Sequence, residues 1–171
     1  MSAEAALLVS VTDVRRRLGT RKTVERSLEA RSLELSDVAV PDGASITFRG
    51  EVESISEGIV LTGTAEVPWS GACRRCLRDV DGVATVEIRE IYETRPTDGE
   101  TWPLVDDHID LAPLLRDTAL LALPLAPICS DECEGPDPDR FPTGPADDGD
   151  EAQEGPPVDP RWAALGDVEF D

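Results

Sequence analysis

Residues 45–67, SITFRGEVESISEGIVLTGTAEV, decide the fold of this chain, because their apolar residues recur at every second position. Ile46 and Phe48 fall on one face of an extended strand, while charged and hydroxyl side chains fall on the other. The Ser-Glu-Gly of residues 56–58 predicts a turn. Residues 59–67 then repeat the alternation. The pattern predicts an antiparallel hairpin with one buried face.

Further segments extend this hairpin on both sides. A third alternating segment, residues 80–92, turns the hairpin into a three-stranded antiparallel meander. Strands are also expected at residues 7–11 and 23–35. Between those two strands, Asp13 is expected to cap a single helical turn that Gly19 ends.

A helix after Asp110 is expected to cover one face of the meander. Asp110 is a suitable N-cap, Pro113 falls in the first turn where a missing N–H costs little, and Pro124 ends the helix. Helical spacing predicts an apolar, largely buried stripe made of Leu111, Leu114, Leu115, Thr118 and Ala122, widened by Leu120, Leu121 and Leu123. The predicted fold class is therefore α+β, an antiparallel β-meander packed against a largely apolar helix.

The four cysteines of the chain stand in two tight pairs, Cys73 with Cys76 and Cys129 with Cys133. Two thiolates on each of two distant turns are typical of a tetrahedral zinc site. Because the chain does not begin with an apolar leader, the thiols are expected to stay reduced. The spacing favours a structural zinc ion on the four cysteines. Such an ion would staple the tip of the second hairpin to the exit of the helix.

Other interpretations of this region stay open. The cysteines could be structural thiols without metal, since free cysteine behaves as a small hydrophobe, or they could form a thiol or zinc redox-responsive site. Arg74 and Arg75, inside the first pair, also have two interpretations. They could lower the thiol pKa and balance the charge of the thiolates, or they could project toward phosphate.

The formal net charge of −20 is spread unevenly along the chain. Residues 131–160 hold eleven acids against one base and seven of the 14 prolines, a composition that predicts disorder. We therefore expect residues 1–133 to form a single domain and residues 134–158 to form an acidic, proline-rich linker. Residues 159–171 are expected to form a short docking helix. Its apolar face would carry Trp162 and Leu165.

The stretch from Arg15 to Arg31 has the opposite sign, with seven bases and two acids. Arginine can hold phosphate with two parallel hydrogen bonds, so this stretch is the candidate for contact with RNA or with a partner. The candidate contact residues are Arg15, Arg16, Arg17, Arg21, Lys22 and Arg26, together with Arg74 and Arg75 of the first knuckle. An ordinary solvated face, or a dock for the acidic tail, explains the same charges. The net charge of −20 argues against tight, autonomous RNA binding.

Catalytic signatures do not stand out in the sequence. It contains neither a glycine-rich phosphate loop nor a Gly-x-Ser-x-Gly elbow. The single histidine, His108, follows Asp106 and Asp107, which is more typical of a wet loop than of a magnesium-dependent nuclease. We therefore expect a protein that is not an enzyme and has no small-molecule substrate. No apolar run is long enough to span a membrane, and the expected location is cytoplasmic.

The sequence resembles the YceD family, bacterial proteins associated with the accumulation of large-subunit ribosomal RNA. The resemblance lies in residues 71–77 (Gly-Ala-Cys-Arg-Arg-Cys-Leu), 110–129 and 159–165, while residues 11–14 and the basic run after them resemble the actinobacterial branch. Many similar proteins continue with a Cys-Pro-x-Cys knuckle where residues 135–139 here are Gly-Pro-Asp-Pro-Asp. The resemblance implies a non-catalytic accessory factor in ribosome biogenesis. Its partner would be ribosomal RNA, a ribosomal protein or an assembly factor.

Overall fold

A computed structural model describes residues 7–140 of the chain. The described residues form nine strands and two helices, which confirms the mixed α+β class. The elements are β1 (Leu8–Ser10), α1 (Thr12–Arg15), β2 (Arg21–Glu29), β3 (Leu33–Leu35), β4 (Val38–Val40), β5 (Ser45–Ser54), β6 (Ile59–Ala72), β7 (Asp79–Glu93), β8 (Trp102–Val105), β9 (His108–Asp110) and α2 (Ala112–Ala122). Within this part of the chain, no helix is long and apolar enough to cross a membrane.

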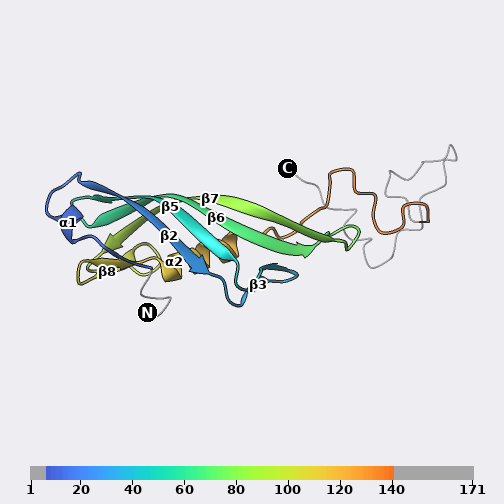
Figure 1. Ribbon diagram of the computed structural model, residues 1–171, viewed down its shortest axis with the longest axis horizontal. Helices are drawn as coiled ribbons and strands as arrows, with labels where there is room; N and C mark the ends of the chain where they lie inside the picture. Colours follow the sequence, from blue (N-terminus) through green and yellow to red (C-terminus); the bar gives the residue numbers. More distant parts are fainter. Residues whose placement is uncertain (1–6, 141–171) are drawn as a thin grey trace, which may run out of the picture.

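The predicted meander forms the centre of the sheet. β5, β6 and β7 pair antiparallel in sequence order, with Phe48 opposite Ala65 and Ala65 opposite Val86. β6 is long enough to pair with both β5 and β4 along one edge, while β7 follows it along the other. Figure 1 shows the result as an elongated, curled sheet in which the β6–β7 hairpin extends well beyond α2.

The inward face of the meander is as apolar as the alternation predicts. Ile46, Phe48 and Leu61 are completely buried. Gly50 lies directly opposite Gly63 in the register, and a Cβ added at either glycine would come within 3 Å of the Phe48 ring. The two glycines therefore leave the space that the aromatic ring fills on the pleated surface.

Helix α2 packs against the sheet through Leu114, Leu115 and Ala119, which are all buried. Its start follows the prediction closely, since the Asp110 carboxylate accepts a hydrogen bond from the Ala112 amide at 2.9 Å, although the N-cap position itself is Leu111. The helix is less buried than predicted, because Leu121 is 87% exposed. The side of the last turn that carries Leu121 opens onto a surface groove instead of the sheet.

Two predictions for the N-terminal third are wrong. Asp13 does not cap α1, because the helix begins at Thr12 and its N-cap, Val11, makes no side-chain capping bond. The turn is held instead by burial of Val11 and Val14. The predicted strand over residues 23–35 is two strands, β2 and β3, because the extended backbone is interrupted between them at Ser32, whose φ is +53°.

Candidate metal centre

The first cysteine pair lies on the tight turn between β6 and β7, as the sequence predicts. Cys73 donates its amide to the Arg78 carbonyl and accepts the Leu77 amide at its own carbonyl, which closes the turn twice. Leu77 has a φ of +61°, so the backbone bends back sharply after Cys76. A turn this tight holds the side chains of Cys73 and Cys76 on one side of the hairpin tip.

The second pair lies on the chain that leaves α2. The helix ends before Pro124, and the extended segment behind it runs along the sheet to the hairpin tip (Figure 1). There the Pro127 carbonyl accepts the Arg74 amide at 2.8 Å, and the Cys133 amide donates to the Ser130 carbonyl at 3.1 Å. The first bond docks this segment on the first turn, and the second bond curls the chain so that Cys133 returns toward Cys129.

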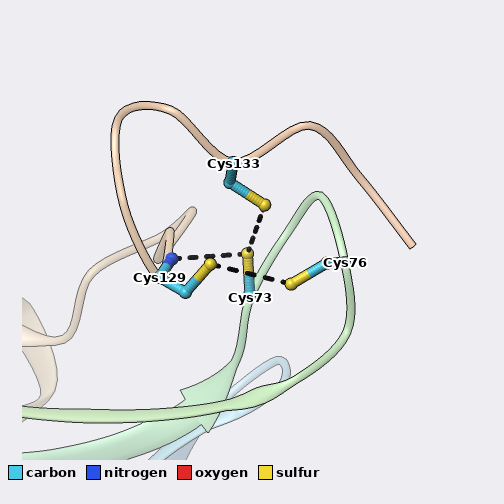
Figure 2. A group of neighbouring side chains, drawn as sticks. All are labelled: Cys73, Cys76, Cys129 and Cys133. Atoms are coloured by element: carbon cyan, nitrogen blue, oxygen red, sulfur yellow. Dashed lines mark hydrogen bonds between the residues drawn. The ribbon is translucent and has the colours of Figure 1, made fainter. Parts of the chain in front are cut away.

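The two pairs meet at one point. Figure 2 shows the four sulfur atoms facing a common centre, with Cys73 and Cys76 on one loop and Cys129 and Cys133 on the other. The Sγ atoms of Cys73 and Cys133 lie 3.8 Å apart, and those of Cys76 and Cys129 lie 3.7 Å apart. All four Sγ atoms lie within 4.8 Å of one another, so the group could hold a metal ion.

The cysteine cluster is separate from the main apolar core. Cys73, Cys76 and Cys133 are buried, whereas Cys129 is exposed. Val80 alone among the partly buried apolar residues of the described chain packs against the cluster. Little apolar burial is therefore present to hold the two loops together.

Hydrogen bonds to sulfur favour thiolates in the first knuckle. The Cys76 amide, helped by the amides of Arg75 and Cys129, lowers the pKa of Cys73 to about 6. The amide and guanidinium of Arg78 lower the pKa of Cys76. The side-chain contact with Cys133 and, to a smaller extent, burial away from solvent raise the pKa of Cys129 to about 11. The backbone of the first turn thus prepares anionic ligands, because an amide donor stabilises the charged form of sulfur.

Among the described residues, Arg78 is the cation whose side chain contacts the sulfurs of the cluster, and it was not among the predicted site residues. Its Nε donates to the Cys76 sulfur at 3.3 Å, and a terminal nitrogen lies 3.8 Å from the Cys129 sulfur. Those sulfurs in turn raise the pKa of Arg78, with Cys76 making the largest contribution. The sequence signal that could have identified Arg78 is its position two residues after Cys76, where the turn leads back into β7.

The guanidinium groups of Arg74 and Arg75 lie against the backbone of the second loop. Arg74 donates from its guanidinium to the Leu125 carbonyl at 3.2 Å, and Arg75 donates to the carbonyls of Asp131 and Cys133 at 3.0 Å each. Neither guanidinium is bonded to a sulfur. Both side chains instead tie the first turn to the backbone of the second loop, so they hold the two cysteine pairs side by side.

Ion pairs with carboxylates occupy part of the basic stretch. Arg15 pairs with Asp107, and Arg21 pairs with both Glu51 and Glu53. The rest of the side-chain contacts join Lys22 to the Ser10 carbonyl, Arg26 to the Glu25 carbonyl and Arg31 to Glu29. Arg16 and Arg17 are exposed and, in the part of the chain that the structure describes, have no side-chain partner.

The remaining candidates do not join the cysteine cluster. Asp106 and Asp107, with φ values of +47° and +59°, form the turn between β8 and β9. His108 is exposed, and its Nδ1 lies 2.7 Å from the Asp106 carbonyl oxygen. Trp162, Leu165 and most of the predicted acidic linker lie outside the described residues.

Comparison with known proteins identifies relatives of the chain. The family described as "Large ribosomal RNA subunit accumulation protein YceD" matches residues 61–169. Uncharacterized proteins of Mycobacterium tuberculosis and Mycobacterium bovis are each 35% identical over 136 residues, covering 75% of this chain and 64% of the relative. A Mycobacterium leprae protein, also uncharacterized, is 34% identical over 140 residues. The chain thus spans less than two thirds of these relatives' length, and no solved structure matches it.

Proposed function

The chain belongs to the YceD family of large ribosomal RNA subunit accumulation proteins, and we propose that it is a non-catalytic accessory factor in ribosome biogenesis. In this proposal it supports the accumulation or processing of large-subunit ribosomal RNA. The observation that carries the proposal is the family match, which covers the cysteine turn, the helix and the second cysteine pair together.

The metal in this proposal is zinc, and its part is structural. A tetrahedral zinc ion with Zn–S bonds of about 2.3 Å separates neighbouring sulfurs by about 3.8 Å. Two sulfur pairs that join the loops, Cys76 with Cys129 and Cys73 with Cys133, lie at 3.7 and 3.8 Å, which supports this ion. Four thiolates would hold it: Cys73, Cys76, Cys129 and Cys133. They leave no coordination position open to water or substrate, so such a site favours stability over catalysis.

Two experiments test the proposal separately. Deleting the gene should lower the ratio of large-subunit to small-subunit ribosomal RNA, and the intact gene should restore the ratio. An unchanged ratio in the deletion strain contradicts the RNA part of the proposal. Metal analysis of the purified chain should find one zinc ion per chain, and a metal-free native protein contradicts the zinc part.

A thiol-based switch is the second candidate, and the exposure of Cys129 favours it. The exposed Cys129 opens the cluster to oxidants, and the neighbouring Cys73 and Cys76, whose pKa values are lowered, supply the reactive thiolates. The rate of alkylation separates the two candidates. Thiols that stay unreactive until a chelator is added support the structural site, whereas fast alkylation of the native chain supports the switch.

Direct contact with RNA is a narrower proposal within the same function. Because Arg15 and Arg21 are already paired with carboxylates, we assign the contact first to Arg16 and Arg17. Changing both to alanine should weaken ultraviolet crosslinking to RNA in cells. Changing Arg21 and Arg31, whose guanidinium groups are paired with carboxylates, should alter crosslinking much less.

A further inference from the structure

A groove lies on the side of the molecule away from the cysteines, between α2 and the segment from β7 to β8. Its volume is about 660 Å³, and its lining is more apolar than polar. The lining residues come from the end of β7, the loop over residues 96–101, the start of β8 and one side of α2. None of them belongs to the cysteine cluster.

The floor of the groove is held in place by packing and by a hydrogen bond. Leu114 and Thr118 are 4% and 8% exposed, so both are fixed by the packing of α2 on the sheet. The Trp102 indole donates its N–H to the Glu90 carboxylate at 3.1 Å, and its ring lies 6.4 Å from the ring of the buried Tyr92. A surface held in this way is formed before any partner arrives, so less ordering free energy opposes binding.

Leu121 stands at the edge of this floor. It follows Leu114 by two helical turns, so it lies on nearly the same side of α2. Its side chain is nevertheless 87% exposed, the most exposed large apolar residue of the described chain. Next to an apolar groove, such a leucine offers a contact that only a partner can bury.

The rim of the groove is acidic. Four carboxylates line it, from Glu90, Asp98, Glu100 and Asp117, and no basic residue is among the lining residues. The edge of the groove therefore favours a positively charged partner, while its floor favours apolar side chains. These two requirements together describe a peptide in which apolar residues are flanked by lysine or arginine.

We propose that this groove binds a basic, amphipathic peptide segment of a partner protein. The same charges argue against the chain's own C-terminal segment, because residues 141–171 carry nine acids and one base. They argue against a second copy of the groove face, since two acidic rims repel one another. The inference rests on the proposed function in one respect, because ribosomal proteins are basic and are the partners that such a surface suits.

Direct binding to synthetic peptides tests the inference. The probe is a fluorescein-labelled peptide of about 15 residues, long enough for a helix, with leucines at helical spacing and lysines between them. One control peptide replaces the lysines by glutamate, and a second replaces the leucines by serine. Fluorescence anisotropy with the full chain should show binding of the first peptide alone, and binding should weaken as salt is raised.

Matched variants locate the binding. Leu121→Ser should weaken binding about tenfold, because it removes an apolar contact at the groove. Leu125→Ser changes another exposed leucine that does not line the groove, and it should leave the affinity unchanged. Asp117→Asn should weaken binding severalfold, whereas Glu57→Gln, at the β5–β6 turn, should not. All four side chains are exposed, so the variants should fold.

Several results would overturn the inference. These are equal affinity of the wild type and Leu121→Ser, equal binding of the glutamate peptide, or a dimer in the wild type that Leu121→Ser dissociates. A gain in peptide affinity on removal of residues 141–171 would also overturn it, because the chain's own segment would then occupy the groove. Absence of peptide binding would overturn the inference about the groove and leave the proposed function standing. An unchanged ribosomal RNA ratio in the deletion strain would contradict the proposed function and leave the groove inference standing.

Discussion

Different forces stabilise two regions of this molecule, the apolar body and the corner that carries the four cysteines. The body, where β5, β6 and α2 meet, buries apolar side chains such as Phe48, Leu61 and Leu115 completely. The cysteine corner has Val80 as its one packed apolar partner within the described residues and depends on sulfur, arginine and backbone hydrogen bonds. Apolar burial is non-directional and shared among many contacts, whereas the corner requires a few contacts at fixed distances.

This difference predicts that the two regions can fail separately. A body with a contiguous core should remain folded when the corner opens, because few contacts link the two regions. The two cysteine loops should not stay packed against each other without their sulfur contacts. Ordering them costs conformational entropy, and little apolar burial is present to offset that cost.

The largest effect is expected from the core. Phe48→Ala removes a fully buried ring that lies over the Gly50–Gly63 pair and should lower the free energy of unfolding by about 3–5 kcal/mol. Thr47→Ala, one residue earlier on the opposite face, should change it by less than about 1 kcal/mol. Urea unfolding followed by circular dichroism measures both. Similar losses for the two variants would mean that the meander has no preferred inner face.

Breaking the corner should have a local effect. Cys73→Ser removes one of the four sulfurs and should release the metal, while Ser130→Ala in the second loop should retain it. In Cys73→Ser, amide exchange in residues 73–78 and 127–133 should be about a hundredfold faster than in the wild type, when the wild type is measured at a free zinc concentration 100 times the dissociation constant of its zinc site. Protection in β5 and α2 should persist. Loss of protection throughout the chain would show that the body depends on the corner.

Arg78 should increase the zinc affinity of the cysteine site without being required for its formation. Arg78→Met removes the guanidinium that contacts the sulfurs of Cys76 and Cys129 and should weaken zinc binding about tenfold. Competition with a zinc-binding dye measures this change. Arg95→Met, in the loop after β7, serves as the matched loss of one charge and should leave the affinity unchanged. An unaltered affinity in Arg78→Met would show that backbone amides alone support the thiolates.

Acid should act on the corner before it acts on the body. In the metal-free chain the pKa of Cys73 is about 6 in the folded state, against an ordinary value of 9.0. The unfolded chain therefore binds the additional proton between these values, so this thiol stabilises the folded corner above pH 9.0 and loses that contribution as the pH falls through 6. Thiolate absorbance of the metal-free chain should show one step near pH 6. A first step near pH 9 would contradict the assignment.

Sequence patterns predict this structure correctly where the signal is local. The alternation in residues 45–67 predicted β5, the β5–β6 turn and most of β6, because period-two patterning requires only neighbouring residues. Sequence patterns failed for the short strands β4, β8 and β9, whose few residues carry no periodic signal. They also failed at Leu121, because a helical stripe cannot show where the sheet beneath a helix ends.

The amino-acid sequence by itself determined the antiparallel meander, the helix between Asp110 and Pro124, and the presence of two closely spaced thiol pairs. These features depend on contacts between residues near one another in the chain. Only the tertiary structure decided that Arg78 contacts the sulfurs, that Arg74 and Arg75 hold the second loop, and that β8 and α2 enclose an acidic groove. The reason is physical: each of these contacts joins side chains or backbone groups that come close only after the sheet curls and the chain behind α2 returns along it.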